Sequence, residues 1–338
     1  MAHRYATDAS SHPLPCRPRR WLAVLIVFTL AATARADEGA LHSQIPSGVT
    51  DPQRVIALEF LDTEIALALE LPIVGVADKA AYRRWVEVGA EALTEAVDVG
   101  GRAEPSLEQI IRLQPDLIVG STWRHAGVAD RLARIAPLAL YRDLPKPEAS
   151  DQFTRMRAIV RDLGSRTGRA QRAESVLARI DAYLAQGREQ LAEAGLEGTP
   201  VVFGQVVQGN DRIRLFTDNS MVVQVMQRLG LRNGWDAPPG EYGYRSGDIG
   251  ALRTLSDGVH LVLSAAADSR SYRALTEHPA WAELAPVRAG NAHRVARELW
   301  PFGGPYSAMR IGNRLVERLT GSPINAAPPT VDGASTTR

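Results

Sequence analysis

An arginine in a glycine-rich loop is the first residue whose type and position predict ligand binding. Arg102 follows the short segment 97–99 and precedes Ser106, which has the type and position of a helix N-cap. Ligands of α/β proteins bind in loops of this kind, at the carboxyl ends of strands. The guanidinium group is planar, donates to two oxygen atoms at once and stays charged at any relevant pH. Arg102 is therefore predicted to bind ligand oxygens, and the alternative is a surface ion pair with Glu104.

Two further loops combine aromatic and basic side chains. One follows the apolar segment Leu117–Val119, and the other precedes Asp248 just as Arg102 precedes Ser106. This repeated order predicts that the second loop faces the cleft that contains Arg102. Trp85 lies in a segment too polar for a core strand and is expected to add ligand-contacting surface, with packing inside a lobe as the alternative. The loop residues are Trp123, Arg124, His125, Tyr242, Tyr244 and Arg245.

The sequence lacks the motifs of several common enzyme classes. It contains no Gly-x-Ser-x-Gly elbow, no phosphate-binding glycine-rich loop and no His-Glu-x-x-His pair. We therefore predict that the protein is not an enzyme. Direct binding of a bare metal ion is the rival class, although the available histidines have no paired spacing and His278 beside Pro279 fits a cap. These histidines are His125, His260, His278 and His293.

The surrounding sequence alternates short apolar segments with helical patterns. A helix over Leu107–Leu113 leads directly into the strand Leu117–Val119, and Asp248–Leu255 leads into Val259–Leu263 in the same way. Such alternation predicts mainly parallel sheets covered on both faces, and the fold class is α/β with two Rossmann-like lobes. Further strands are expected over Arg54–Leu58, Ile73–Ala77 and Pro200–Phe203, and further helices over Asp62–Glu70, Val222–Leu229 and Pro305–Leu319.

A long helical segment separates the two halves. Gln171–Ala194 spans some 24 residues, about 36 Å as a helix, and only Gly187 opposes it. Its position predicts one long rigid α-helix that joins the lobes, with a simple covering helix as the alternative. The domain boundaries expected are a signal peptide over 1–36, an N-terminal lobe over 37–168, the inter-lobe helix over 169–195, a C-terminal lobe over 196–321 and a disordered tail over 322–338.

The first 36 residues have the features of an export signal. The basic segment Arg17–Arg20 precedes the apolar run Trp21–Ala32, which is too short to span a bilayer. Ala34–Ala36 fits a small-x-small site with cleavage after its last residue. The arginine pair in the basic segment leaves Sec and twin-arginine export both open. Cys16, the only cysteine, precedes the run, so the mature chain has no thiol and its predicted destination is the periplasm.

The charge of the mature chain argues against nucleic-acid binding. The first 36 residues hold five of the 39 basic and one of the 38 acidic residues, which leaves 34 basic and 37 acidic residues after cleavage. A slightly acidic surface lacks the positive field that attracts a phosphate backbone. We expect a monomer that does not bind nucleic acid.

Five segments occur in an order that resembles a known family: Arg54–Glu59, Tyr82–Val86, Asp98–Pro105, Leu132–Pro137 and Ser307–Met309. The family is that of the ferric hydroxamate-binding proteins, periplasmic receptors of siderophore ABC importers. The resemblance implies two α/β lobes, one long connecting helix and a shallow cleft. It also implies that the siderophore itself holds the iron, so that the protein needs no cofactor and no metal ligands.

The resemblance assigns roles to individual residues. Arg102 matches the family's ligand-binding arginine, and Trp85 and Tyr242 match tryptophans of the cleft. The family's ligand-contacting tyrosine has no counterpart in the loop Trp123–His125, and which of these three residues replaces it stays open. For Tyr242 the alternative is packing within a lobe. Trp300 and Phe302 match an aromatic cluster on the same wall, with structural packing again as the alternative.

The resemblance also implies partners. The family docks onto an inner-membrane ABC permease, which has a cytoplasmic ATPase, through one acidic residue on each lobe. Asp130 falls at the first of these positions. The second falls on Gly250, a departure from the pattern, and Asp248 is the nearby candidate. The function expected is a periplasmic receptor for a ferric siderophore, of the hydroxamate type, with carboxylate or catecholate siderophores, ferric citrate, haem and cobalamin as alternatives.

Overall fold

The computed structural model describes residues 43–44, 50–142, 144, 151–296 and 299–326. All of them belong to one compact unit, Gly39–Arg338. The predicted signal peptide and its cleavage site lie outside the described residues. Among the helices that are described, none is both long and apolar enough to cross a bilayer.

The N-terminal lobe contains a six-stranded sheet with strand order β1-β6-β5-β2-β3-β4. All neighbouring strands are parallel except β1, which is antiparallel to β6. The strands are β1 Ser43–Gln44, β2 Val55–Ala57, β3 Ile73–Val76, β4 Val97–Asp98, β5 Leu117–Ser121 and β6 Leu138–Tyr141. The helices are α1 Phe60–Ala68, α2 Lys79–Trp85, α3 Leu107–Arg112, α4 Thr122–His125 and α5 Ala129–Ala133.

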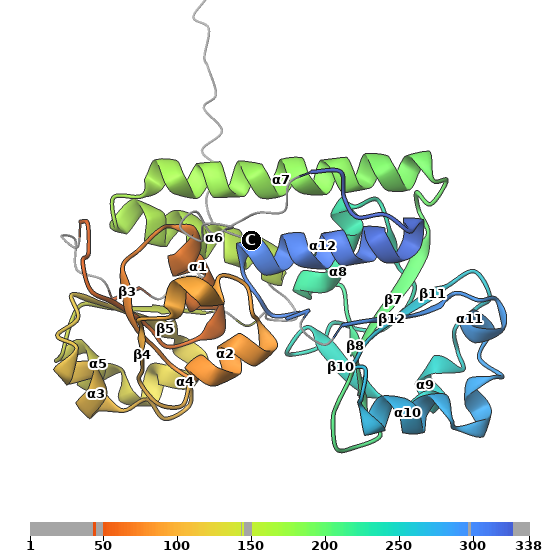
Figure 1. The fold of residues 1–338 in the computed structure, drawn as a ribbon, viewed down its shortest axis with the longest axis horizontal. Helices are drawn as coiled ribbons and strands as arrows, with labels where there is room; N and C mark the ends of the chain where they lie inside the picture. The colour runs from red at the N-terminus through yellow and green to blue at the C-terminus, as the bar shows by residue number, and fades with distance from the viewer. Residues whose placement is uncertain (1–42, 45–49, 143, 145–150, 297–298, 327–338) are drawn as a thin grey trace, which may run out of the picture. The chain divides into compact units, whose positions relative to one another are not determined.

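Both faces of this sheet are buried, which explains the continuous apolar segments in the sequence. In β5, Leu117 and Val119 pack into a core with α1, whereas Ile118 packs into a second core with Ile110 of α3. Successive side chains of a strand point to opposite faces, so both cores draw on the same short segment. Figure 1 shows α1 on one side of the strands and α3 and α5 on the other.

The C-terminal lobe contains a sheet with strand order β10-β8-β7-β11-β12, and β9 also pairs with β7. The pairs β7–β9, β7–β11 and β11–β12 are parallel, whereas β8 is antiparallel to both β7 and β10. The predicted repeat of the first lobe therefore holds for the β11 region but not for this antiparallel edge. The strands are β7 Pro200–Val206, β8 Ile213–Phe216, β9 Arg232–Asn233, β10 Tyr244–Gly247, β11 His260–Ser264 and β12 Ala292–Val295.

Four helices of this lobe are α8 Met221–Arg228, α9 Ile249–Leu252, α10 Arg270–Thr276 and α11 Ala285–Arg288. Asp248 caps α9 as the sequence predicts, because its carboxylate accepts from the backbone N–H groups of Gly250 and Ala251. The helix ends four residues later, earlier than expected. Beyond it, Arg253 and Leu255 donate to carbonyls three residues back, which is the pattern of turns and not of an α-helix.

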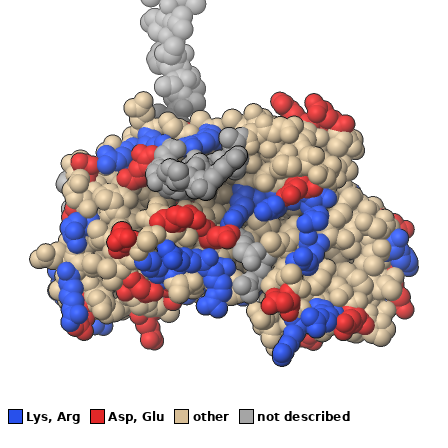
Figure 2. All heavy atoms as spheres, in the orientation of Figure 1, with Lys and Arg blue, Asp and Glu red and all other residues tan. Residues whose placement is uncertain are grey.

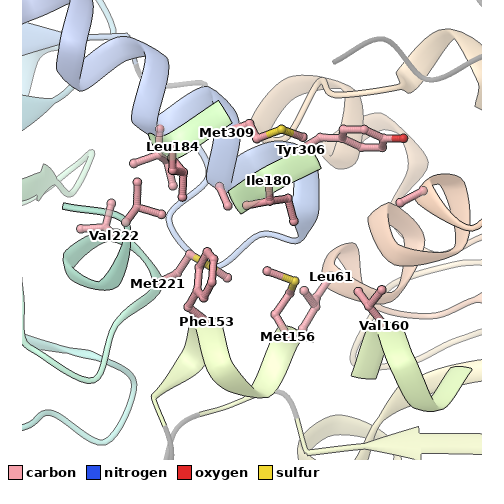
Figure 3. Close-up of a cluster of buried hydrophobic side chains, with 14 of the residues drawn as sticks. Leu61, Phe153, Met156, Val160, Ile180, Leu184, Met221, Val222, Tyr306 and Met309 are labelled. Carbon is pink, nitrogen blue, oxygen red and sulfur yellow. The ribbon is translucent and has the colours of Figure 1, made fainter. Parts of the chain in front are cut away.

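The inter-lobe helix α7 spans Ala170–Glu193, 24 residues. It packs against α6, Gln152–Arg166, and against α12, Pro305–Thr320, and in Figure 1 it runs along both lobes. Figure 3 shows side chains from α1, α6, α7, α8 and α12 meeting in one apolar cluster. The fold class predicted from the sequence, two α/β lobes joined by one long helix, is confirmed.

A buried carboxylate on α1 caps the closing helix. The N-cap residue of α12 is Gly304, which has no side chain to satisfy the exposed N–H groups of the first turn. Glu64 of α1 is buried and takes this role. Its oxygens accept from Gly304 N (2.9 Å), Ser307 N (2.6 Å) and Ser307 Oγ (2.7 Å). The Glu64 side chain thus lies at the N-terminus of α12, where the helix dipole favours a negatively charged group.

The chain after α12 departs from the predicted disordered tail. Ile324 packs into the core at 3% exposure, and its backbone N–H donates to Asn313 Oδ1 at 2.8 Å. Gln190 of α7 donates to the carbonyls of Ser322 and Pro323. An apolar residue that reaches the core fixes the segment up to Ala326, and residues 327–338 lie outside the described part.

Candidate ligand-binding site

A cavity of about 230 Å³ is lined by residues of both lobes. The lining combines three guanidinium groups, one carboxylate and a majority of aromatic or apolar side chains. Figure 2 shows basic side chains on both sides of the indentation between the lobes on this face. The lining residues are Glu59, Leu61, Arg102, Trp123, Arg124, Leu144, Gln152, Arg214, Tyr242, Tyr244, Trp300 and Phe302.

Arg102 lies between β4 and α3, where the sequence places it. Its guanidinium donates from Nη1 to Glu59 Oε1 at 2.6 Å and from Nε to Asp78 Oδ2 at 3.2 Å. The group also lies over the Phe60 ring, 3.7 Å from the centroid. The alternative of a surface pair with Glu104 is therefore wrong. Arg102 reaches the cavity wall with its position fixed by two carboxylates and a ring.

Glu59 is the centre of this arrangement. It lies two residues after the end of β2, its side chain is only 7% exposed, and its Oε1 accepts from Phe60 N at 2.9 Å as the N-cap of α1. Its Oε2 accepts a short hydrogen bond from Arg124 Nε. One buried carboxylate thus holds two arginines of the cavity wall. Sequence reasoning missed Glu59, although its position at the end of a predicted strand is the signal that identified Arg102.

The short helix α4 brings a tryptophan and an arginine to the cavity. Ser121 ends β5 and caps α4 by accepting from Trp123 N at 3.2 Å. The Arg124 guanidinium lies 4.0 Å from the centroid of the Trp123 ring, a cation–π geometry. Trp123 is 51% exposed, unusual for so large an apolar side chain. Both residues line the cavity as the sequence predicts.

His125 is buried beneath the site and does not line the cavity, which corrects the sequence-based expectation. Its Nδ1 accepts from Ser121 N at 3.0 Å, and its Nε2 lies 2.8 Å from the carbonyl oxygen of Arg102, to which it donates. Consecutive residues of a helix point in different directions, so Arg124 faces the cavity while His125 faces the core. His125 therefore ties α4 to the loop that carries Arg102.

The pKa of His125 leads to a first prediction. Burial lowers this pKa below the ordinary value of 6.5, so the contribution of the neutral ring to stability is complete above 6.5 and is lost as the pH falls through the lowered pKa. Protonated Nδ1 no longer accepts from Ser121. We expect His125→Asn, which keeps an acceptor but does not titrate, to lose less thermal stability than wild type as the pH falls below 6.5. Melting temperatures measured in parallel across this range test this, and parallel curves would contradict it.

The C-terminal lobe supplies the aromatic wall of the cavity. The ring centroids of Tyr242 and Tyr244 are 6.2 Å apart, and Phe302 lies 6.0 Å from Tyr244 and 5.4 Å from Trp300. Tyr242 also meets Trp123 of the other lobe edge-on at 6.0 Å. These side chains form a continuous apolar surface that contacts both lobes. All four were expected from the sequence to line the cleft.

Arg214 of β8 is a basic residue of this wall that sequence reasoning missed. Its Nη1 donates to Gln205 Oε1 at 3.0 Å, and its guanidinium lies 5.0 Å from the centroid of the Tyr244 ring. No sequence signal identified it, because β8 belongs to the antiparallel edge that the repeat did not predict. Leu61, Leu144 and Gln152 were also missed.

Two further expectations are corrected. Arg245 follows Tyr244 on β10, and the alternation of a strand sends it to the opposite face, where its Nε donates to Pro238 O at 2.7 Å. Trp85 ends α2 and packs against the cluster that contains Phe60 and Tyr82. Neither residue lines the cavity. For Trp85 the alternative of packing within a lobe is therefore the one that the contacts support.

The two candidate docking residues lie on the surface of their lobes. Asp130 is exposed in the first turn of α5. Asp248 is half-exposed, caps α9 and pairs with Arg212 Nη1 at 3.4 Å. Its role as a helix cap is thus established, and a docking role for either residue stays a prediction.

The histidines do not assemble a metal centre in the described part of the chain, where no group of three or more His, Cys, Asp or Glu side chains has suitable geometry. His260 Nδ1 and His293 Nε2 lie 3.1 Å apart on β11 and β12, and their hydrogen bond occupies both atoms. His278 caps the short helix at Pro279–Trp281 as the sequence predicts.

The sequence pattern of the periplasmic binding protein family matches residues 55–295. Since this is well over half of the chain, the protein belongs to that family, whose members are substrate-binding transport proteins. The family resemblance stated from the sequence is confirmed.

Individual relatives bind iron chelates. The chain is 28% identical over 260 residues to the iron(3+)-hydroxamate-binding protein FhuD of Escherichia coli (strain K12), covering 77% of this chain and 84% of that protein. It is 26% identical to the Fe(3+) dicitrate-binding periplasmic protein FecB of the same organism, over 90% of this chain and 95% of that protein. The solved structure of FhuD from Vibrio cholerae with Fe³⁺–Desferal matches 80% of this chain and 99% of its own at 24% identity and a TM-score of 0.72, which shows a shared fold.

Proposed function

We propose that this protein is a periplasmic receptor that binds a ferric siderophore between its lobes and delivers it to an inner-membrane ABC permease. A hydroxamate-type chelate is the first candidate, because FhuD is among the relatives. The observation that carries the proposal is one cavity in which guanidinium groups of both lobes meet a continuous aromatic wall. The arginines donate to the oxygens that coordinate iron, and the rings cover the organic part of the chelate.

The role proposed is binding without catalysis. The iron arrives with its coordination complete, so the receptor supplies hydrogen-bond donors and apolar surface and needs no metal ligands. One or two charge-assisted hydrogen bonds, at about 1.5–3 kcal/mol each, together with aromatic burial, account for the roughly 8 kcal/mol of micromolar binding or better. Export by the N-terminal signal and docking through Asp130 and Asp248 belong to the same proposal.

The experiment that tests this function is a fluorescence titration of the mature protein. Trp123 is half-exposed at the cavity, so a bound ferric chelate is expected to quench its emission. The titrants are a ferric trihydroxamate, a ferric tricatecholate, ferric citrate and haem. We expect saturable quenching by the trihydroxamate at submicromolar concentration, and a smaller quenching amplitude in Trp123→Phe, which keeps an aromatic ring at this position.

Trp281 serves as the matched control, because it lies in the C-terminal lobe outside the cavity. Trp281→Phe should leave the quenching amplitude nearly intact. Absence of quenching by all four chelates, checked by calorimetry, would refute the proposed function and leave the fold unaffected. A preference for ferric citrate would support the proposed receptor function but change the class of its ligand.

A further inference from the structure

The charges of the cavity do not cancel. Arg102, Arg124 and Arg214 line it, whereas Glu59 is the single carboxylate among the described lining residues. Asp78 also pairs with Arg102, but its side chain lies outside the cavity wall. A ferric trihydroxamate core is electrically neutral, since three singly charged hydroxamates balance the ferric ion. A neutral chelate would therefore leave the positive excess of this wall without a partner.

Glu59 is held in place by three donors. Its carboxylate accepts from the backbone N–H of Phe60 as the cap of α1, and it is buried between the two arginines that it holds. It is therefore part of the wall that a ligand meets. Its negative charge lowers the positive potential that the ligand meets.

The arginines keep donors for a ligand. Toward the described residues, Arg124 donates through Nε alone, and Arg214 donates through Nη1 alone. Their remaining N–H groups are geometrically suited to carboxylate or similar anionic oxygens. One of these arginines belongs to the N-terminal lobe and the other to the C-terminal lobe, so an anionic group is favoured on either side of the chelate.

We infer that the cavity selects ferric chelates of net negative charge and that Glu59, as a positioning residue for Arg102 and Arg124, sets the strength of that selection. This inference rests on the proposed function. It predicts opposite effects for two substitutions in one wall: removal of the Glu59 charge strengthens the preference for anionic chelates, and removal of the Arg214 charge weakens it.

A series of chelates that share one iron centre but differ in the charge of a pendant group separates the effect of charge from that of shape. Ferric desferrioxamine B carries a pendant ammonium group, its N-acetyl derivative a neutral one and its N-succinyl derivative a carboxylate. We expect wild-type affinity to rise in that order, with about tenfold between the two charged members. Glu59→Gln should increase this affinity ratio by about a further tenfold, and Arg214→Gln should decrease it.

The matched controls remove one negative and one positive charge at residues that do not line the cavity. Glu108 pairs with Arg112 on the exposed face of α3, and Arg212, which immediately precedes β8 and does not line the cavity, pairs with Asp248. Glu108→Gln and Arg212→Gln should leave the ratio at its wild-type value. Melting temperatures of all four variants establish that each is folded.

The outcomes are distinguishable. Equal wild-type affinity for the three chelates, or a ratio unchanged in Glu59→Gln, overturns the inference and leaves the receptor function standing. Weakening of all three chelates by the same factor in Glu59→Gln makes Glu59 merely structural and also overturns it. If the wild-type protein binds none of the three, nor the other chelates titrated above, the proposed function itself fails.

Discussion

Arg102→Ala is expected to weaken the binding of a ferric chelate at least about tenfold, because one charge-assisted hydrogen bond contributes roughly 1.5–3 kcal/mol. The thermal stability should change little, since Glu59 keeps Arg124 and the Phe60 N–H as partners after the substitution. Titration by fluorescence measures the affinity, and thermal unfolding measures the stability. Arg102→Lys keeps the charge but loses the planar fork, so its affinity for the chelate should lie between those of wild type and Arg102→Ala.

The surface arginine Arg112 provides the control for this prediction. It pairs with Glu108 on α3, in the same lobe and away from the cavity. Arg112→Ala should bind the chelate as wild type does. A fall in melting temperature that parallels the loss of affinity in Arg102→Ala would assign Arg102 a structural role instead.

Glu64→Ala is expected to destabilise the protein by about 3–5 kcal/mol. The substitution leaves three buried donors at the start of α12 without their acceptor, and each such group costs about 1–3 kcal/mol. Chemical denaturation measures the free energy of unfolding. Glu87→Ala is the matched control, because Glu87 also links the first lobe to α12, through Arg310, but is half-exposed. Its loss should cost no more than about 1 kcal/mol.

The same carboxylate gives a pH dependence of known sign. Burial raises the pKa of Glu64 above its ordinary value of 4.5, more than the hydrogen bonds from Ser307 and Gly304 lower it. A raised pKa in the folded state means that this group's contribution to stability decreases as the pH rises from 4.5 through the raised pKa. Glu64→Gln does not titrate, so its stability relative to wild type should increase over that range. A constant difference would show that the folded and unfolded pKa values are equal.

The sequence predicted the parts of the fold in which one physical pattern dominates. The buried strand β5 and the helices α7 and α12 lie within a few residues of their expected bounds, because long helical periodicity and short apolar segments bounded by turns leave few alternatives. The antiparallel edge of the second sheet was not predicted. Its strands β8 and β10 are four residues long and mix apolar with polar residues, so no period marks them.

The site was predictable where a residue's position alone decides its role. Arg102 and Trp123 follow strand ends, and the cavity is located there. His125 and Arg245 were placed in the cavity because they belong to the right loops, but each adjoins a cavity residue and turns away from it. Local sequence order does not determine which neighbour faces the ligand. Glu59 was not predicted, because the sequence pattern indicates donors for ligand oxygens and not the carboxylate that holds those donors in place.

The apolar cluster around α7 has a consequence for how the protein unfolds. This core is continuous: it contains Val55 and Leu117 of the first sheet, Ile180 of α7 and Phe203 of the second sheet. Neither lobe can lose its packing without exposing surface that belongs to the other. We therefore expect the two lobes to unfold together, in one transition and not two. In that case, a ligand bound at the cavity is expected to stabilise both lobes, including strands that it does not contact.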